Sequence, residues 1–326
     1  MATDASSRTP KLVWLITGTS SGFGKRFAIS AIRKGDAVIA TSRTLQSLQD
    51  LPTLALAALS SSSDSTSSTD SIIDISTHLH LMELDVNWDT SAIHETVKKA
   101  LDIYGRVDVL VNNAGWAFKN VVEDVGSAEF KTQFQTNFFG LIDVTNAVLP
   151  QMRQRRSGTV VMMGSRSSWT AELPVTALYA ASKAAVRVYT ETLATELAPF
   201  SVRFLIVEPG AFRTEGIHSA RPYQPPQFSE SNPDPRPEYA PVGERMVEWY
   251  RSIDGNQKGN PDKAVELIVD IVKEEGKAKE KIEETGWPLY LVLGKDGEEG
   301  VREKCQKMLK VVDEWGDFVE GLEFEN

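Results

Sequence analysis

The sequence predicts a doubly wound α/β fold, in which helices cover both faces of a largely parallel sheet of seven strands. Short runs rich in β-branched and apolar residues alternate with longer amphipathic segments, and this alternation is typical of right-handed crossovers between parallel strands. The first such run passes directly into a Gly-rich turn and then into a helical pattern. Hydrophobic residues make up 41% of the chain and charged residues 25%, which is the balance of a globular protein.

The expected strands are short and hydrophobic, as strands buried on both faces of a sheet are. They cover residues 11–17, 37–41, 78–86, 107–111, 159–163, 202–207 and 289–293. The segments between them repeat apolar residues at helical spacing. The expected helices cover residues 22–34, 91–104, 128–152, 176–198 and 263–274, and Asn260 followed by Pro261 and Asp262 favours a helix start before the last of these.

Two segments depart from this rhythm. Residues 60–71 read SSSSDSTSSTDS, too polar to bury anything, so we expect a flexible, disordered surface insert. Residues 221–241 hold seven prolines, which disfavour a regular helix and a central strand. The second segment is either a mobile lid or an irregular excursion.

The chain of 326 residues is long enough for two domains, but the continuous strand–helix pattern favours one. We expect a flexible N-terminus over residues 1–10 and a single domain over residues 11–326. Within that domain, residues 215–260 form a substrate loop region, and residues 261–326 form a C-terminal helix–strand–helix extension.

Charge and cysteine content narrow the class of protein. Lys and Arg number 35 and Asp and Glu 45, a formal net charge of −10, which argues against binding to nucleic acid or anionic lipid. The single cysteine, Cys305, cannot form an intrachain disulfide framework or a cysteine-based zinc site, and we expect no metal. The N-terminus lacks the apolar core of a leader, and no run approaches the ~18 apolar residues of a spanning helix. We therefore expect a soluble, cytoplasmic protein.

A Gly-rich turn follows the first strand. It reads TGTSSGFG and contains Gly18, Gly22 and Gly24. Glycine lets backbone amides at a helix N-terminus approach a phosphate closely, so this turn between strand and helix indicates a dinucleotide site.

The end of the second strand bears on which dinucleotide binds. An Asp or Glu there would accept hydrogen bonds from a ribose 2′-hydroxyl, whereas this chain has Ser42 and Arg43. Because a guanidinium can pair with a 2′-phosphate, we expect NADP(H) to be preferred over NAD(H). The alternative is that Arg43 is merely solvated at a strand end.

A tyrosine and a lysine share one face of a later helix. Tyr179 and Lys183 stand four residues apart, so both side chains lie on one helical face. A nearby ammonium stabilises the phenolate and lowers the phenol's pKa, which makes the two residues a plausible acid/base pair. Their alternative reading is a solvated helix edge.

Together these motifs resemble the classical short-chain dehydrogenase/reductase (SDR) family. The matching features are TGTSSGFG, NNAG, Asn137 in QTNFFG, Ser165, YAASK and PGAFRT, which occur in the family's order over about residues 12–214. The segments GNQKGNPDKAVELI and LYLVLGKDGEEGVREK resemble the tail of a fungal-type subgroup. The resemblance implies a Rossmann-type fold that binds a nicotinamide dinucleotide.

The resemblance also implies the catalytic residues. Tyr179 would be the general acid/base, and Lys183 would hold the nicotinamide ribose and tune the phenol. Ser165 would bind the substrate oxygen, and Asn137 would anchor a water in a proton relay. The interval from Ser165 to Tyr179 is one residue longer than the family's usual interval, which leaves Ser167 as the rival catalytic serine.

The cofactor residues follow from the same motifs. The resemblance places Asp85 near the adenine, Asn113 along the cofactor channel, and Pro209 and Thr214 at the edge of the nicotinamide. The full set is Gly18, Ser20, Ser21, Gly22, Phe23, Gly24, Ser42, Arg43, Asp85, Val86, Asn113, Ala114, Gly115, Tyr179, Lys183, Pro209, Gly210 and Thr214.

We therefore expect an NADP(H)-dependent oxidoreductase that interconverts a ketone or aldehyde and an alcohol on a small, largely apolar molecule. Trp116, Phe118, Trp169 and Leu173 are candidates to line the substrate pocket or, alternatively, ordinary packing residues. We expect a homodimer or homotetramer formed through the helices at residues 128–152 and 176–198. The alternative functions are a non-catalytic dinucleotide-binding sensor on the same fold, and an SDR-scaffold dehydratase or epimerase.

Overall fold

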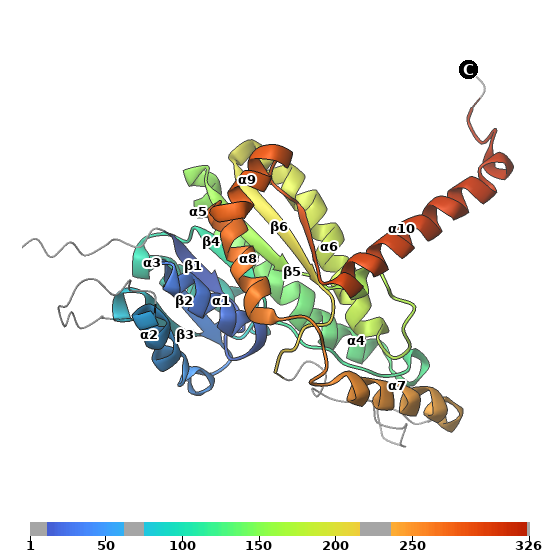
Figure 1. The fold of residues 1–326 in the computed structure, drawn as a ribbon, viewed down its shortest axis with the longest axis horizontal. Helices are drawn as coiled ribbons and strands as arrows, with labels where there is room; N and C mark the ends of the chain where they lie inside the picture. The colour runs from blue at the N-terminus through green and yellow to red at the C-terminus, as the bar shows by residue number, and fades with distance from the viewer. Residues whose placement is uncertain (1–11, 62–74, 216–235, 325–326) are drawn as a thin grey trace, which may run out of the picture.

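The computed structural model describes residues 12–61, 75–215 and 236–324. Within these residues seven strands form one sheet in which every pair is parallel, in the order β3-β2-β1-β4-β5-β6-β7 (Figure 1). The strands are β1 (Val13–Ile16), β2 (Ala37–Ser42), β3 (Leu79–Glu83), β4 (Val109–Asn112), β5 (Gly158–Met163), β6 (Val202–Pro209) and β7 (Tyr290–Leu293). The predicted fold class is confirmed. The direction of winding reverses between β1 and β4, and such a switch point leaves a crevice at the carboxyl ends of the strands.

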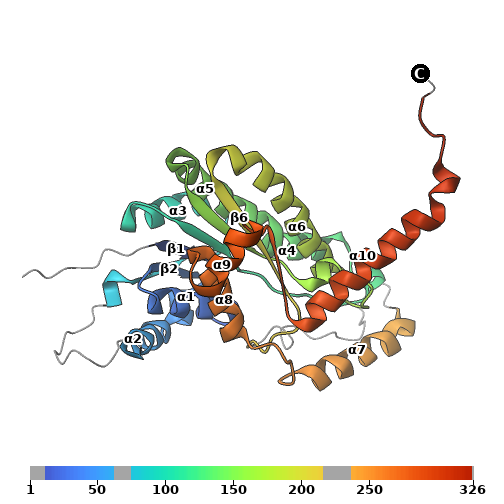
Figure 2. The same cartoon turned by 45° about the horizontal axis from the view of Figure 1, so that its top comes forward.

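Helices cover both faces of the sheet (Figures 1 and 2). One face carries α1 (Gly22–Arg33), α2 (Leu51–Ser61), α8 (Pro261–Lys273) and α9 (Gly276–Thr285), and the other carries α3 (Thr90–Tyr104), α5 (Gly140–Arg155) and α6 (Ala177–Leu197). Side chains of β1 alternate between the two cores: Trp14 and Ile16 pack with the first group, and Val13 and Leu15 with the second. This period-two alternation explains why the strand is apolar throughout.

A buried ion pair ties the N-terminal strands to α8. Asp36, directly before β2, is fully buried and accepts hydrogen bonds from Trp14 Nε1 at 3.0 Å and Lys273 Nζ at 2.7 and 2.8 Å. The two charges balance each other inside the protein, where either one alone would be costly.

The helix expected over residues 128–152 is interrupted. The chain forms α4 (Ser127–Phe134), a π-helical turn (Gln135–Phe139) and then α5. A π-turn adds one residue to the helical repeat, and such turns are frequent at functional sites. The inserted turn contains Asn137, whose side chain is fully buried.

Helix α2 was not expected. Its residues Leu51 and Ala55 are buried against the first face of the sheet, so tertiary packing stabilises a segment that the sequence pattern left unassigned. Ser60 and Ser61, the start of the expected insert, belong to the last turn of α2. The rest of that insert lies outside the described residues.

The Pro-rich segment is partly helical, which corrects the expectation. Its part up to residue 235 lies outside the described residues, but a 3₁₀ turn (Pro237–Tyr239) leads directly into α7 (Ala240–Ile253). Pro237 and Pro241 occupy the first positions of their helices, where a missing backbone N–H costs no hydrogen bond.

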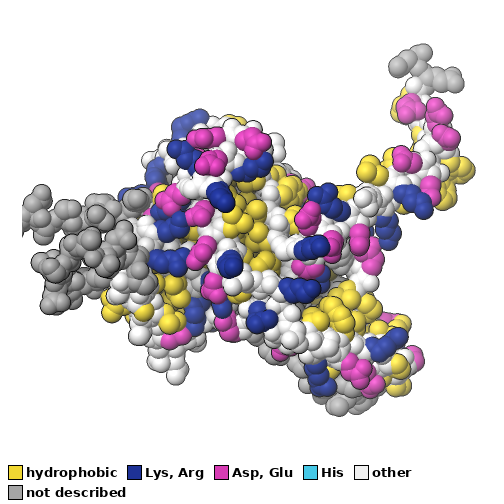
Figure 3. Space-filling model, viewed as in Figure 1, with side chains coloured by type: hydrophobic (Ala, Val, Ile, Leu, Met, Phe, Trp, Pro, Cys, Tyr) yellow, Lys and Arg dark blue, Asp and Glu magenta, His cyan; other side chains and the backbone are white. Residues whose placement is uncertain are grey.

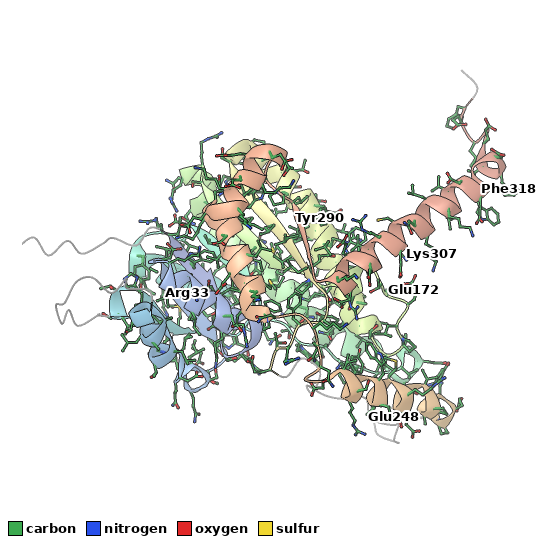
Figure 4. All side chains as sticks on the ribbon, viewed as in Figure 1. Arg33, Glu172, Glu248, Tyr290, Lys307 and Phe318 are labelled. Carbon is green, nitrogen blue, oxygen red and sulfur yellow. The ribbon has the colours of Figure 1, made fainter. Side chains whose placement is uncertain are left out.

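The C-terminal extension ends in a long helix, α10 (Lys295–Trp315), that projects from the sheet (Figures 1 and 2). About midway along this helix, Lys307 Nζ lies 3.1 Å from the Glu172 carboxylate (Figure 4). Farther out, hydrophobic side chains are exposed between charged ones (Figure 3), including Leu309, Val312 and Phe318. None of the helices in the described ranges combines the length and the apolar character needed to cross a bilayer. The single-domain boundary at residues 11–326 stays a prediction.

Candidate active site

The Gly-rich turn joins β1 to α1 at the crevice. Gly18 has φ +70°, a left-handed conformation that favours glycine. A Cβ on Gly24 would lie 2.2 Å from the Gly18 carbonyl oxygen and 2.5 Å from Asn113 Nδ2, so only glycine fits there. Asn113 Nδ2 donates to the carbonyl oxygens of Thr17 and Gly18, each at 2.9 Å. The two motifs thus hold each other's backbone in place.

This turn lines an open groove of about 710 Å³. Most residues predicted to bind the cofactor line it: Gly18, Ser20, Ser21, Gly22, Phe23, Ser42, Arg43, Asp85, Val86, Asn113, Ala114, Gly115 and Thr214. Gly24 is not among the groove-lining residues and instead packs inside the turn, against the Gly18 carbonyl oxygen. The predicted cofactor set omitted seven residues that also line the groove: Leu84, Asn87, Trp116, Ala117, Thr132, Thr136 and Glu215.

Glu215 occupies the N-terminus of α1. Its carboxylate accepts from Gly22 N at 2.9 Å and from the guanidinium of Arg26, also at 2.9 Å. Arg26 Nε lies 3.0 Å from Asp262 as well. The guanidinium is therefore held between two carboxylates, whereas Arg43 lies exposed on the wall of the groove.

A smaller cavity of about 170 Å³ adjoins the groove. Phe23, Asn113, Gly115, Trp116, Ala117 and Thr214 line both spaces. Ser165, Tyr179, Lys183, Pro209 and Gly210 line the cavity. The structure therefore brings the predicted catalytic serine, tyrosine and lysine to one wall of a space that opens beside the predicted cofactor groove.

Tyr179 is half-buried near the start of α6. Burial raises the pKa of its phenol, a hydrogen bond with Ser165 opposes that shift, and the charge of Glu208 adds to it. The expectation that a lysine would lower this pKa is not met in this geometry, because desolvation disfavours the phenolate more strongly than its surroundings stabilise it.

Lys183 is buried one turn along the same helix. Its Nζ donates to the Met163 carbonyl oxygen at 2.6 Å and lies 5.9 Å from the centroid of the Tyr179 ring. Burial lowers the pKa of Lys183 to about 8, against an opposing effect of Glu208. A Cβ on Gly115 would lie 3.6 Å from the same Nζ, so the amine sits where groove and cavity meet.

The two rival serines follow β5. Ser165 is 7% exposed, and its Oγ accepts from Ser167 N at 3.2 Å. Both serines line the cavity, but the described hydrogen bond to Tyr179 is made by Ser165.

Asn137 lies behind the wall of the cavity. Its Nδ2 donates to the Trp116 carbonyl oxygen at 2.9 Å and to Ser182 Oγ at 3.0 Å, and its Oδ1 accepts from Trp116 N at 3.0 Å. This amide fixes the backbone of the strand-end segment against the helix that carries Tyr179.

Glu208 is a buried acid that sequence reasoning missed. It is fully buried at the end of β6, and Ser168 Oγ lies 2.9 and 3.1 Å from its two carboxylate oxygens. Burial raises the pKa of Glu208 to about 7, although Ser168 and the charges of Arg187 and Lys183 counteract it.

The cavity's outer wall was also unforeseen. It includes Lys119 and, from α7, Trp249, Tyr250 and Ile253. Sequence spacing could not predict that residues of α7 line the cavity, because this helix follows the Pro-rich segment. Of the four candidate pocket residues, Trp116 and Leu173 line the cavity.

The other two candidates pack elsewhere. Phe118 contacts Trp116 edge-on at 5.9 Å, and its backbone N–H donates to Gln133. Trp169 packs against Tyr290 at 6.3 Å and beneath the guanidinium of Arg187 at 4.5 Å. In the described part of the chain, no cluster of three or more His, Cys, Asp or Glu side chains is arranged to hold a metal ion.

Comparison with known proteins agrees with this geometry. A family model described as short chain dehydrogenase matches residues 12–224. Oxidoreductase BOA17 of Botryotinia fuckeliana (strain B05.10) is 30% identical over 306 residues, which are 94% of this chain and 97% of that protein. Oxidoreductase claN of Passalora fulva is 35% identical over 210 residues, 64% of this chain and 85% of that protein.

Solved structures extend the likeness to the whole fold. A short-chain dehydrogenase from Streptomyces avermitilis is 34% identical, with a TM-score of 0.73, over 96% of this chain and 99% of its own. A serine dehydrogenase complexed with NADP⁺ is 25% identical, with a TM-score of 0.59, over 80% of this chain and 88% of its own. The chain belongs to the short-chain dehydrogenase/reductase family, whose fold binds nicotinamide dinucleotides, and it is an oxidoreductase acting on CH–OH groups.

Proposed function

We propose that the protein is an NADP(H)-dependent reductase/dehydrogenase that interconverts a ketone or aldehyde and an alcohol on a small molecule with a largely apolar body. One observation carries this proposal: Ser165, Tyr179 and Lys183 line a cavity that shares wall residues with the dinucleotide groove. A substrate carbonyl in the cavity would lie beside both a proton donor and the nicotinamide end of the groove.

The residues of the groove fit a dinucleotide. Gly18 and Gly24 keep the turn tight enough for a pyrophosphate to approach backbone amides at the start of α1. Because Glu215 accepts from Gly22 N, its carboxylate would have to leave that amide when an anion binds there. The bound cofactor supplies or accepts the hydride. Arg43, exposed on the groove wall, would pair with a 2′-phosphate and so favour NADP(H).

The proton is the protein's contribution. A raised pKa keeps the Tyr179 phenol protonated near neutral pH, which suits donation to a carbonyl oxygen as hydride arrives at the carbon. Ser165 would hold that oxygen by a hydrogen bond, and Lys183 would bind the nicotinamide ribose. Asn137, which fixes the Trp116 backbone and Ser182, would anchor a water in the proton relay.

The test is NADPH consumption with a panel of ketones and aldehydes, repeated with NADH. We expect turnover with at least one carbonyl class and a higher kcat/KM for NADPH. Tight NADPH binding without turnover of any carbonyl compound would favour a sensor instead. Conversion of a substrate without net change in cofactor would favour a dehydratase or epimerase.

The proposal includes assembly and location. Phe139 and Val188 are exposed hydrophobic side chains on the helices expected to form an oligomer, and their burial in a homodimer or homotetramer would lower the free energy of association. Light scattering tests this assembly, with a monomer at micromolar concentration counting against it. We also propose that the protein is cytoplasmic and belongs to a fungal-type subgroup, in keeping with its likeness to BOA17; cell fractionation tests the location.

A further inference from the structure

Glu208 is a buried acid that the proposed mechanism does not use. It lies on β6, four residues after Phe204, which packs with the core on the α3, α5 and α6 side of the sheet. Side chains four residues apart on a strand point to the same face, so the carboxyl group of Glu208 lies on the side that α6 covers. Burying such a group is costly unless it is hydrogen-bonded, and its partners therefore indicate what it does.

One partner of Glu208 is the hydroxyl group of Ser168. The hydroxyl donates to the carboxyl group, with Oγ 2.9 and 3.1 Å from its two oxygens. Ser168 is the last residue of the 3₁₀ turn Arg166–Ser168, and its backbone N–H donates to the Ser165 carbonyl oxygen at 2.9 Å. A single side chain thus joins the carboxyl group on β6 to the turn that begins after Ser165.

The carboxyl group contacts the chain on both sides of Ser165. A Cβ on Gly164 would lie 3.1 Å from Glu208 Oε1, so the carboxyl group packs closely against the backbone that leads into the serine. Ser165 itself caps the turn, because its Oγ accepts from Ser167 N at 3.2 Å. The same hydroxyl makes the hydrogen bond with Tyr179. Its position relative to the phenol therefore depends on the backbone that Glu208 contacts.

We propose that Glu208 is a positioning residue, which fixes the turn through Ser168 and thereby orients the Ser165 hydroxyl toward the Tyr179 phenol. This inference rests on the proposed function, in which Ser165 holds the substrate oxygen. Glu208 is not among the residues that line the cavity, so it acts on the reaction through the serine. Misplacing a catalytic group by about 1 Å can cost about 100-fold in rate, which is why a remote anchor matters to turnover.

The turnover test is a double-mutant cycle on kcat for carbonyl reduction. Ser168→Ala removes the link and leaves every side chain that lines the cavity. We expect kcat to fall by about 10- to 100-fold, with the affinity for NADPH unchanged. In a Ser165→Ala background the same change should cost less than about twofold, because the hydroxyl that it positions is already gone. A loss in the double variant equal to the product of the two single losses would overturn the inference.

Variants of Glu208 test the anchor itself. Glu208→Gln keeps an oxygen that accepts from Ser168 and should retain more of kcat than Glu208→Leu, which accepts nothing; equal kcat in these two variants would overturn the role of the carboxyl oxygen. Ser30→Ala, which removes another buried serine hydroxyl on α1, is the matched control and should leave kcat unchanged. Melting temperature is measured for every variant, and if Glu208→Leu does not fold, the cycle of the two serines decides.

A spectroscopic measurement separates this inference from the proposed function. The ¹³Cζ resonance of the Tyr179 ring, assigned by its loss in Tyr179→Phe, reports the hydrogen bond to the phenol without any substrate. We expect Ser165→Ala and Ser168→Ala to shift this resonance alike at neutral pH, and the double variant to match Ser165→Ala. Carbonyl turnover together with an unshifted resonance in Ser168→Ala would overturn the inference and leave the proposed function standing. The expected shifts without turnover of any carbonyl compound would overturn the function and keep the positioning role.

Discussion

The two halves of the cleft are built in different ways. The cofactor groove is made by short contiguous stretches at strand ends, with Gly18 and Gly24 in one turn and Asn113 in the next motif. The substrate cavity is walled by residues from distant segments, such as Lys119 after β4 and Tyr250 on α7. Under the proposed function, backbone geometry would bind the dinucleotide, and side chains packed from distant segments would contact the substrate. Sequence motifs therefore predict the residues of the cofactor groove far better than those of the substrate cavity.

The largest expected effect concerns Tyr179, which lines the cavity beside the groove. Phe at this position keeps the ring and removes the transferable proton, so carbonyl reduction should fall by at least the ~10² typical of one acid/base group. NADPH binding, followed by fluorescence, should be unchanged, since the groove is not altered. Near-normal turnover in Tyr179→Phe with intact NADPH binding would show that the proton comes from elsewhere.

Ser165→Ala tests the substrate half alone. A hydroxyl aimed at a developing oxyanion is typically worth ~3 kcal/mol of transition-state stabilisation, so kcat should fall by about two orders of magnitude. Ser167→Ala, its neighbour on the same wall, is the matched control and should have a much smaller effect on kcat. The reverse order would mean that Ser167 binds the substrate oxygen.

Arg43→Asp tests the cofactor half alone. The change removes a cation that can pair with a 2′-phosphate and adds a carboxylate that repels it but accepts from a ribose hydroxyl. We expect the ratio of kcat/KM for NADPH over NADH to fall by about tenfold or more, the size of one charge-assisted hydrogen bond. Arg33→Asp makes the same charge change at the far end of α1 (Figure 4) and should leave the ratio unaltered. An unaltered ratio in Arg43→Asp would remove this residue from the cofactor site.

The smallest expected effect concerns stability near the cavity. Burial raises the pKa of Glu208 to about 7, above the value of an exposed glutamate, so the wild type loses stability as pH rises from about 4.3 through about 7. Glu208→Gln does not ionise and should escape that loss. Its free energy of unfolding relative to the wild type should rise by about 2 kcal/mol between about pH 5 and about pH 8.

Denaturant unfolding at the two pH values measures this difference. The same gain in Glu208→Gln at both pH values would show that Glu208 does not titrate across this range in the folded protein.

Sequence reasoning recovered the sheet because each strand carries its own apolar pattern and its own turn chemistry. It also recovered the convergence of Ser165, Tyr179 and Lys183, since carboxyl ends of parallel strands meet at one edge. It did not recover Lys119 or Glu208. From sequence alone, a lysine or glutamate near a strand end is interpreted as a solvated charge. Whether that side chain is buried depends on which distant helix covers the strand end. The π-turn at Asn137 was missed for a similar reason, because one inserted residue leaves the helical periodicity nearly intact.

The buried pair of Asp36 and Lys273 has a consequence for how the chain acquires its structure. The two residues are 237 positions apart. The Asp36 carboxylate can therefore form this ion pair only after most of the polypeptide, including Lys273, has been synthesised. Until then it would be left as a costly unpaired charge under the first strands. A chain released from the ribosome before residue 273 should therefore be unable to complete its N-terminal half. Late closure of this kind is typical of slow folding dominated by non-local contacts.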